Sequence, residues 1–362
     1  MNPLTALLAE PDTSRSMDAA NWDCVIRHAR YARLIASLLA LFERHGSIDT
    51  VPSPVLETMR GSRVYIDYLQ LQIRREIDHL AQVADTTDFP VILLKGAAYL
   101  VSGLPPASGR RMNDIDLLVP RERLTEFEDS LKARGWRSSE LNDYDERYYR
   151  KWMHEIPPLT HPLRGIEIDV HHNLTPPTSR HYPDGKKLVE AAVAIEGTPF
   201  LRLCDEDLVL HSATHLFFND ELRGGLRDLW DLHLLCAEFS EDEGFWLRLA
   251  ERALELNLGR PLYYAADTLR RLLRTPVPDT VFTALAPVAP KGITLKLMRS
   301  LISRHLAPED VDAPHSRIVE LLLFVRSHWV RMPPLMLARH LTIKWWRGQR
   351  RRDPATATGG GR

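Results

Sequence analysis

The feature that most constrains the fold is a short apolar run that carries two carboxylates at alternate positions. The segment Met112-Asn-Asp-Ile-Asp-Leu-Leu-Val119 has the length and apolar content of a buried strand. Because strand side chains alternate between faces, Asp114 and Asp116 point to one side while the apolar residues around them point into a core. Adjacent like charges repel each other, and proteins usually accept that cost where a divalent cation or a proton is shared.

A second apolar run further along the chain offers a matching polar face. In Gly165-Ile-Glu-Ile-Asp-Val-His-His172, a strand would place Glu167, Asp169 and His171 on one face and His172 on the other. Asp169 would then complete a set of three carboxylates, enough to hold two Mg²⁺ or Mn²⁺ ions roughly 3.5 to 4 Å apart. The alternative is that this face is only the solvated side of an antiparallel sheet.

Positive charge lies near both carboxylate strands. The run Val91-Ile-Leu-Leu-Lys-Gly-Ala-Ala-Tyr99 begins as a buried strand and reaches Lys95-Gly96. Lys95 and Arg110, or Arg111 in its place, would supply charge to a triphosphate, with bidentate contacts from the arginine. The alternative is that these cations form salt bridges to the carboxylates and do not contact a substrate.

Bulk composition excludes several classes of protein. The 362 residues carry a formal net charge of −1, so no overall field favours nucleic acid or an acidic membrane. Cys24, Cys204 and Cys236 lie far apart and form no CxxC pair, which argues against a disulfide framework and for a reducing cytoplasm. No stretch reaches about 18 uncharged apolar residues, so we expect no membrane span.

Helical periodicity brackets the strand region on both sides. At the N-terminus, apolar residues recur at helical spacing over 17–46 and 54–84, and one helix is expected within the strand region at 121–134. In the C-terminal half, the same spacing predicts helices near 205–218, 226–238, 243–256, 260–273, 292–306 and 316–330. The prediction is an α+β protein with a small mixed sheet, an N-terminal helical hairpin and a C-terminal helical region. The expected segments are 1–88 (helical), 89–204 (core), 205–347 (helical) and 348–362 (disordered tail).

Polar residues of the C-terminal half are second-tier candidates. His211 and His215 lie at a spacing that can hold zinc on a helix, although without a third ligand we expect them to serve packing. Arg227, Asp228 and Asp231 on the following helix either reach the cleft or pair with each other.

The end of the chain combines tryptophan with arginine. Trp345 and Trp346 stand beside Arg347 and the run 350–352, residue types that suit a weak contact with a membrane surface or nucleic acid. Most such ends are simply solvated.

Taken together, Leu94-Lys-Gly96, Arg110, Asp114-Ile-Asp-Leu-Leu-Val119 and Ile168-Asp-Val-His171 resemble the polymerase-β-type nucleotidyltransferase superfamily. More closely, they resemble the bacterial group of uncharacterised nucleotidyltransferase family proteins, over about residues 90–275. The resemblance implies that Asp114, Asp116 and Asp169 bind metal, with Asp169 as base or as a residue that orients the acceptor.

The resemblance also implies a nucleotide-binding turn. Gly96 matches the glycine whose backbone approaches the phosphates, and Ala97 stands where serine or glycine is usual. The interval from Ala97 to Asp114 is longer than usual in the superfamily, and its segment Gly103–Gly109 is expected to form a mobile loop over the site.

The function expected from these features is a cytoplasmic, Mg²⁺- or Mn²⁺-dependent nucleotidyltransferase. It would bind an NTP such as ATP and move an NMP group to a hydroxyl, amine or phosphate, releasing pyrophosphate. The acceptor would be a small molecule or, less readily, protein or RNA. Ala97 and the long loop keep open a catalytically weak module that binds a nucleotide or partner, and an antitoxin-like transferase acting on RNA or protein is a further alternative.

Overall fold

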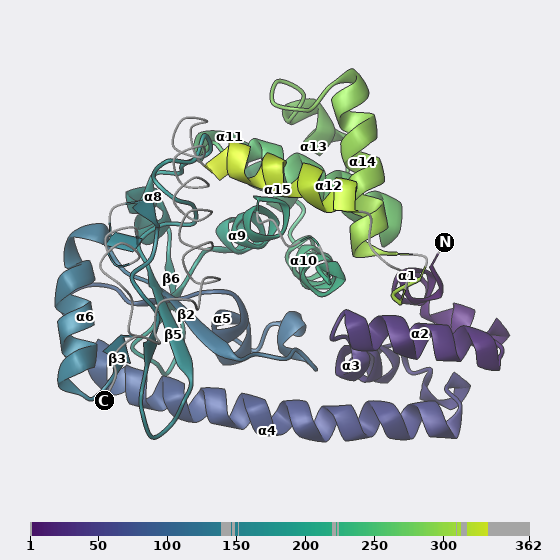
Figure 1. Cartoon of the computed structure of the whole chain (residues 1–362), viewed down its shortest axis with the longest axis horizontal. Coiled ribbons are helices and arrows are strands. Elements are labelled where there is room, and N and C mark those ends of the chain that lie inside the picture. The colour runs from purple at the N-terminus through teal and green to yellow at the C-terminus, as the bar shows by residue number, and fades with distance from the viewer. Residues whose placement is uncertain are drawn as a thin grey trace, which may run out of the picture.

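The computed structural model describes residues 2–138, 146, 149–150, 152–218, 222, 224–308, 310–312 and 317–331. The predicted disordered tail at 348–362 and the Trp/Arg-rich end lie outside these residues. Figure 1 shows the sheet toward one end of the long axis of the molecule, with most of the helices on one side of it.

The N-terminal region is a cluster of helices rather than one hairpin. Its elements are α1 (Pro3–Ala9), η1 (Pro11–Ser16), α2 (Ala19–Tyr31), α3 (Ile35–His45), η2 (Ile48–Thr50) and α4 (Ser53–Ala84). The prediction of a single helix over 17–46 is wrong, because Arg33 adopts a left-handed conformation with φ of 58°. The Leu34 amide then donates to the Ala29 carbonyl at 2.7 Å, which closes the end of α2. Both helices pack into the same core, so the apolar periodicity continues across the break.

Helix α4 links the N-terminal helices to the sheet. Its buried positions include Met59, Ile66, Ile73, Ile77 and Leu80, whose separations of seven, four and three residues define one face of a helix. The predicted helix over 54–84 is therefore confirmed. In Figure 1, α4 runs past α2 and α3 at one end and past the sheet at the other.

The sheet has seven strands in the order β3-β4-β5-β2-β1-β7-β6. Their bounds are β1 (Ile92–Leu93), β2 (Asp114–Leu118), β3 (Arg137–Ser138), β4 (Leu159–Thr160), β5 (Glu167–His171), β6 (Val193–Ala194) and β7 (Leu201–Arg202). The predicted strands at 91–94, 115–119 and 166–170 are its three central ones. The other four were not predicted, since a strand of two residues has no periodicity to detect.

The two carboxylate strands lie side by side. Strands β2 and β5 pair in parallel, and the register sets Asp114 opposite Glu167 and Asp116 opposite Asp169. β1 and β4 pair antiparallel to these two strands, so the sheet is mixed, as predicted.

The short helices between the strands are α5 (Lys95–Val101), η3 (Pro105–Ala107), η4 (Arg121–Arg123), α6 (Leu124–Ala133) and α8 (Gly185–Glu190). The segment Gly103–Gly109 does not extend over the site as expected. Gln70 of α4 donates to the carbonyls of Ala107 and Arg110 at 2.7 and 3.0 Å. A Cβ on Gly109 would lie 2.5 Å from the backbone of Ala36, so this segment packs directly against α3.

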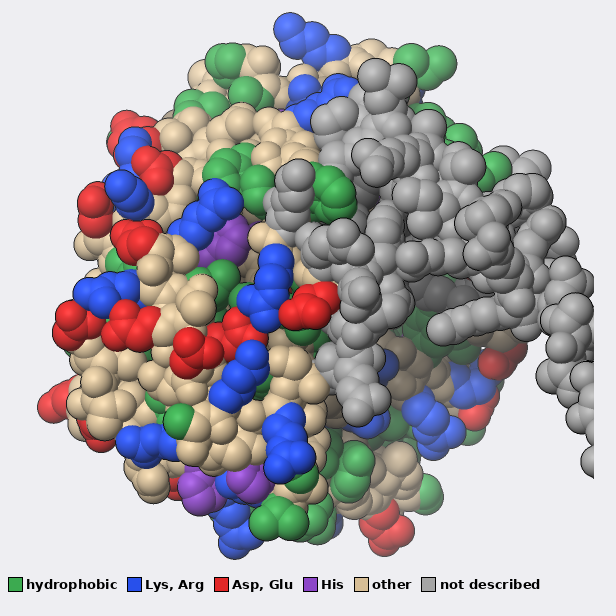
Figure 2. Space-filling view, turned by 60° about the vertical axis from the view of Figure 1, so that its left-hand side comes forward, with side chains coloured by type: hydrophobic (Ala, Val, Ile, Leu, Met, Phe, Trp, Pro, Cys, Tyr) green, Lys and Arg blue, Asp and Glu red, His purple; other side chains and the backbone are tan. Residues whose placement is uncertain are grey.

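The C-terminal half is helical, as predicted. Its helices are α9 (Asp205–Phe218), α10 (Leu226–Phe239), α11 (Phe245–Glu255), α12 (Gly259–Leu272), α13 (Asp279–Ala284), α14 (Gly292–Leu306) and α15 (Arg317–Arg331). One hydrophobic cluster runs from α1 through the sheet into these helices. Among the described helices, none is long and apolar enough to cross a membrane. Figure 2 shows acidic and basic side chains interspersed over one face, in keeping with the balanced charge of the sequence.

Candidate active site

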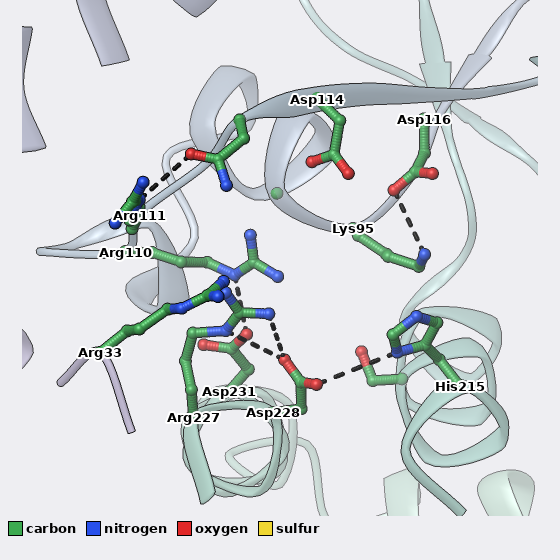
Figure 3. A pocket seen from close by; sticks show the side chains of 13 residues that line it. Arg33, Lys95, Arg110, Arg111, Asp114, Asp116, His215, Arg227, Asp228 and Asp231 are labelled. Carbon is green, nitrogen blue, oxygen red and sulfur yellow. Dashed lines mark hydrogen bonds and ion pairs between the residues drawn. The ribbon is translucent and has the colours of Figure 1, made fainter. Parts of the chain in front are cut away.

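Three predicted carboxylates lie on one face of the β2–β5 pair. Asp114 is exposed at the start of β2, and Asp116 follows on the same face, 9% exposed. Paired strands lie about 4.8 Å apart, so the register brings Asp169 of β5 directly beside Asp116. Figure 3 shows Asp114 and Asp116 facing a pocket whose opposite side carries residues of α9 and α10.

Asp116 is held from two sides. Its Oδ2 lies 3.3 Å from the Lys95 Nζ, and its Oδ1 lies 3.0 Å from the Nε2 of His171. Burial by itself would raise the pKa of Asp116, but Lys95 and His171 outweigh burial and hold that pKa well below its usual range. Asp116 is therefore ionised at neutral pH.

Asp169 has the opposite electrostatic environment. Burial, followed by the charges of Asp116 and Glu155, raises the pKa of Asp169 to about 7. A divalent cation would relieve this crowding of carboxylates, and their oxygen atoms are the ligands that Mg²⁺ and Mn²⁺ prefer. These residues thus fit the predicted metal, which Asp114, Asp116 and Asp169 would hold. Glu167 lies exposed on the same face.

The turn between β1 and α5 positions Lys95. This residue has φ of 41°, a left-handed conformation that costs a non-glycine residue roughly 1–2 kcal/mol. Gly96 follows it and lines the pocket, where a Cβ would lie 2.5 Å from the Nη1 of Arg110 and 2.8 Å from the Sδ of Met112. Any larger residue at this position would therefore force the side chains of Arg110 and Met112 to shift. Ala97 is buried in the core and is not among the residues that line the pocket.

Arg110 and Arg227 are held by aspartates of α10. The Nε of Arg110 lies 2.8 Å from Asp231, and both side chains are buried. Arg227 pairs with its neighbour Asp228 at 2.9 Å. The α10 residues thus both reach the pocket and form ion pairs, and Arg110 pairs across to this helix rather than with the β2 carboxylates. Asp228 also lies 3.9 Å from the Nδ1 of His215.

Arg33 and Arg111 bring further charge to the pocket. Arg111 donates to Asn113 at 3.1 Å, and Arg33 enters from the turn between α2 and α3, as Figure 3 shows. Within the described part of the chain, neither arginine forms an ion pair. Sequence reasoning missed Arg33, because it lies far upstream in a helical pattern and nothing in that pattern indicates where its side chain points.

Helix α9 closes another side of the pocket. Ser212 and His215 line it, and the Ser212 hydroxyl lies 2.6 Å from the hydroxyl of Tyr99. His211 is buried on the same helix, and burial lowers its pKa well below the usual range, with Lys95 adding to the effect. Neither histidine belongs to a group of three possible metal ligands among the described residues; such a group occurs instead at His171, with two residues that the sequence did not single out.

The structure is thus an α+β fold in which a mixed sheet carries carboxylates on two neighbouring strands, and those of β2 face a pocket lined by arginine and lysine. The chain belongs to the family described as uncharacterised nucleotidyltransferase, whose model matches residues 18–274. The matched region includes α2 and α3, and therefore also the turn between them that carries Arg33.

Two other comparisons add little. A solved structure of the antibiotic-resistance factor ANT(2'')-Ia is 17% identical, with a TM-score of 0.33, and the match covers 49% of this chain and 89% of that one. A similarity this low carries nothing over to the chemistry of this protein. No curated protein sequence matches the chain significantly.

Proposed function

We propose that this protein transfers an NMP group from an NTP to an acceptor, in a reaction that needs Mg²⁺ or Mn²⁺ and releases pyrophosphate. The observation that carries the proposal is the register of β2 and β5, in which Asp116 lies beside Asp169 with Asp114 on the same face. Carboxylates on neighbouring strands, at the edge of a pocket lined by arginine and lysine, suit a metal-bound triphosphate.

The chemistry follows from this arrangement. The acceptor oxygen or nitrogen forms a bond to the α-phosphorus, the bond from that phosphorus to the bridging oxygen breaks, and pyrophosphate leaves with the electron pair. A hydroxyl or amine acceptor gives its proton to Asp169, which lies beside Asp116 on the neighbouring strand. The divalent cation, when bound, neutralises charge on the phosphate oxygens.

The cations of the pocket have different roles in this proposal. Arg33 and Arg111 are available to contact the triphosphate, since neither forms an ion pair with a described residue. Arg110 and Arg227 are each engaged by an aspartate of α10 and shape the pocket. Lys95 holds Asp116 in place and lines the same pocket.

Label transfer tests the proposal directly. Purified protein is incubated with Mg²⁺ and an NTP labelled at the α- or the γ-phosphate, together with small-molecule, RNA or protein fractions of a lysate. We expect α-label on an acceptor and γ-label in pyrophosphate. The fraction that becomes labelled identifies the acceptor class, and RNA binding that weakens steeply with salt would support an RNA acceptor.

Matched variants supply the control. The double variant Asp114→Ala/Asp116→Ala should lose transfer, while Asp129→Ala, an exposed aspartate on α6, should keep it. Equal transfer by both variants would overturn the proposal. NTP binding without transfer to any fraction would instead support the module that only binds a nucleotide.

A further inference from the structure

A cluster of possible metal ligands lies next to the nucleotidyl-transfer site. His154, Glu155 and His171 each offer one ligand atom, and these atoms lie within 4.8 Å of one another. They come from β5 and from the segment just before β4. We infer that these three residues form a second metal site, for a transition-metal ion such as Zn²⁺, distinct from the site of the three aspartates.

The backbone holds the cluster together. Glu155 forms an antiparallel bridge with His171. On either side of this bridge, the Ile156 amide donates to the Val170 carbonyl at 3.0 Å and the His172 amide donates to the His154 carbonyl at 2.8 Å. The three ligand residues are thus fixed to one another by main-chain hydrogen bonds before any ion binds, which lowers the cost of ordering the site.

The side chains of His154, Glu155 and His171 lie close enough together to coordinate one ion. The Nδ1 of His171 lies 3.3 Å from the Oε2 of Glu155, and the imidazole rings of His154 and His171 are 5.2 Å apart between centroids. Zinc–ligand bonds of 2.0–2.2 Å place the ligand atoms of a tetrahedral site roughly 3.4 Å apart. Rotation of the partly exposed Glu155 and His154 side chains is sufficient to reach that geometry.

The donor set selects the metal. Two imidazoles and one carboxylate suit zinc and related transition metals, whereas Mg²⁺ prefers oxygen ligands. Three protein ligands leave a fourth position to water. The aspartates and this cluster therefore attract different ions, although they share one strand.

The link between the two sites is His171. A metal on its Nδ1 leaves the proton on Nε2, which donates to Asp116 at 3.0 Å. This is the carboxylate–histidine–metal arrangement, in which the outer carboxylate fixes the tautomer and orientation of the imidazole. Zinc at this position would thus hold Asp116, a proposed ligand of the catalytic metal, in a defined orientation.

Metal content tests the inference independently of transfer. The full-length protein is stripped with a chelator, loaded with Zn²⁺ in excess Mg²⁺, desalted and measured by mass spectrometry for zinc per chain. Co²⁺ loaded in place of zinc reports the coordination through its visible absorption. We expect about one zinc per chain and the spectrum of a low-coordinate nitrogen and oxygen site.

A graded series of variants gives the inference its specificity. His154→Ala and Glu155→Gln should each weaken zinc binding by more than 100-fold, and Asp116→Asn by about 10- to 100-fold, the usual effect of removing an outer partner. His79→Ala, on an exposed position of α4, should bind as the unchanged protein does. Asp114→Ala should lose transfer and keep zinc, which separates failure of this inference from failure of the proposed function.

Two results would overturn the inference. If the unchanged protein retains no more zinc than His154→Ala and Glu155→Gln, while circular dichroism shows all three folded, His171 only bridges two carboxylates through hydrogen bonds. The same conclusion follows if zinc is retained equally by all variants, because the ion then binds elsewhere.

Discussion

The two sides of the pocket manage their charges in opposite ways. On the sheet side, Asp116 and Asp169 lie beside each other, and the pKa of Asp169 is raised to about 7 by burial and by this neighbour. On the helical side, Arg110 and Arg227 each meet an aspartate of α10 one to one. The Arg110–Asp231 pair joins α10 to the segment before β2, whereas crowded like charges on the sheet store a repulsion that a bound cation would release. The contrast predicts that substitutions of the sheet-side carboxylates affect activity and that breaking the buried Arg110–Asp231 pair affects stability.

The largest effect is expected at Asp114. Asp114→Asn removes a proposed metal ligand. Because such a ligand contributes several kcal/mol to stabilisation of the transition state, the rate of transfer should fall about a thousandfold. Because the Asp114 side chain is exposed, the free energy of unfolding of the protein should change by less than about 0.5 kcal/mol. Label transfer and urea unfolding measure the two quantities. A large loss of stability with normal transfer would contradict the prediction that the sheet-side carboxylates serve activity.

The next effect is expected in the buried pair of the helical side. Arg110→Met alone leaves Asp231 buried without its partner and should cost about 3–5 kcal/mol in unfolding free energy. The double variant Arg110→Met/Asp231→Leu should recover most of that loss, because no charge is left unpaired. Urea denaturation checks both. If the double variant regains stability without regaining transfer, Arg110 also contacts the nucleotide.

Arg33 is a cation of the helical side that we expect to act on substrate. Arg33→Gly suits the left-handed backbone, so stability should stay unchanged or rise by up to about 1 kcal/mol. Loss of a charged hydrogen bond to phosphate should raise KM for the NTP about 10-fold. The matched control is Arg274→Gly, which shares the positive φ but does not line the pocket. An equal rise in KM for both variants would rule out a contact between Arg33 and the nucleotide.

The smallest effect is the pH dependence due to His211. Burial holds the pKa of His211 well below the usual value of about 6.5, so below that pH the unfolded chain binds a proton that the folded protein excludes. Stability should therefore fall as pH decreases from about 6.5, and His211→Gln should reduce that slope. Unfolding midpoints at pH 7.5, 6 and 5 test this. An unchanged slope would mean that other groups account for the pH dependence.

Much of the fold could be predicted because its signals are local. Alternation in the run from Asp114 to Leu118 defined β2, and helical periodicity located α4 and α9 to α12 to within a few residues. The break at Arg33 was missed, since both flanking helices face the same core and the pattern continues through it. The two-residue edge strands were missed because they form only when a neighbour offers its backbone.

The sequence by itself determined the carboxylate face of the site. Asp114, Asp116 and Asp169 follow from a period of two on strands, a rule that concerns only neighbours along the chain. The tertiary structure decided which charged side chains from other elements lie near these carboxylates. Arg110 meets Asp231 across 121 residues, and Arg33 and Glu155 reach the site from separate elements. Such contacts depend on how helices pack against the sheet, which no local pattern encodes, and so the partners of each carboxylate became visible only in the folded chain.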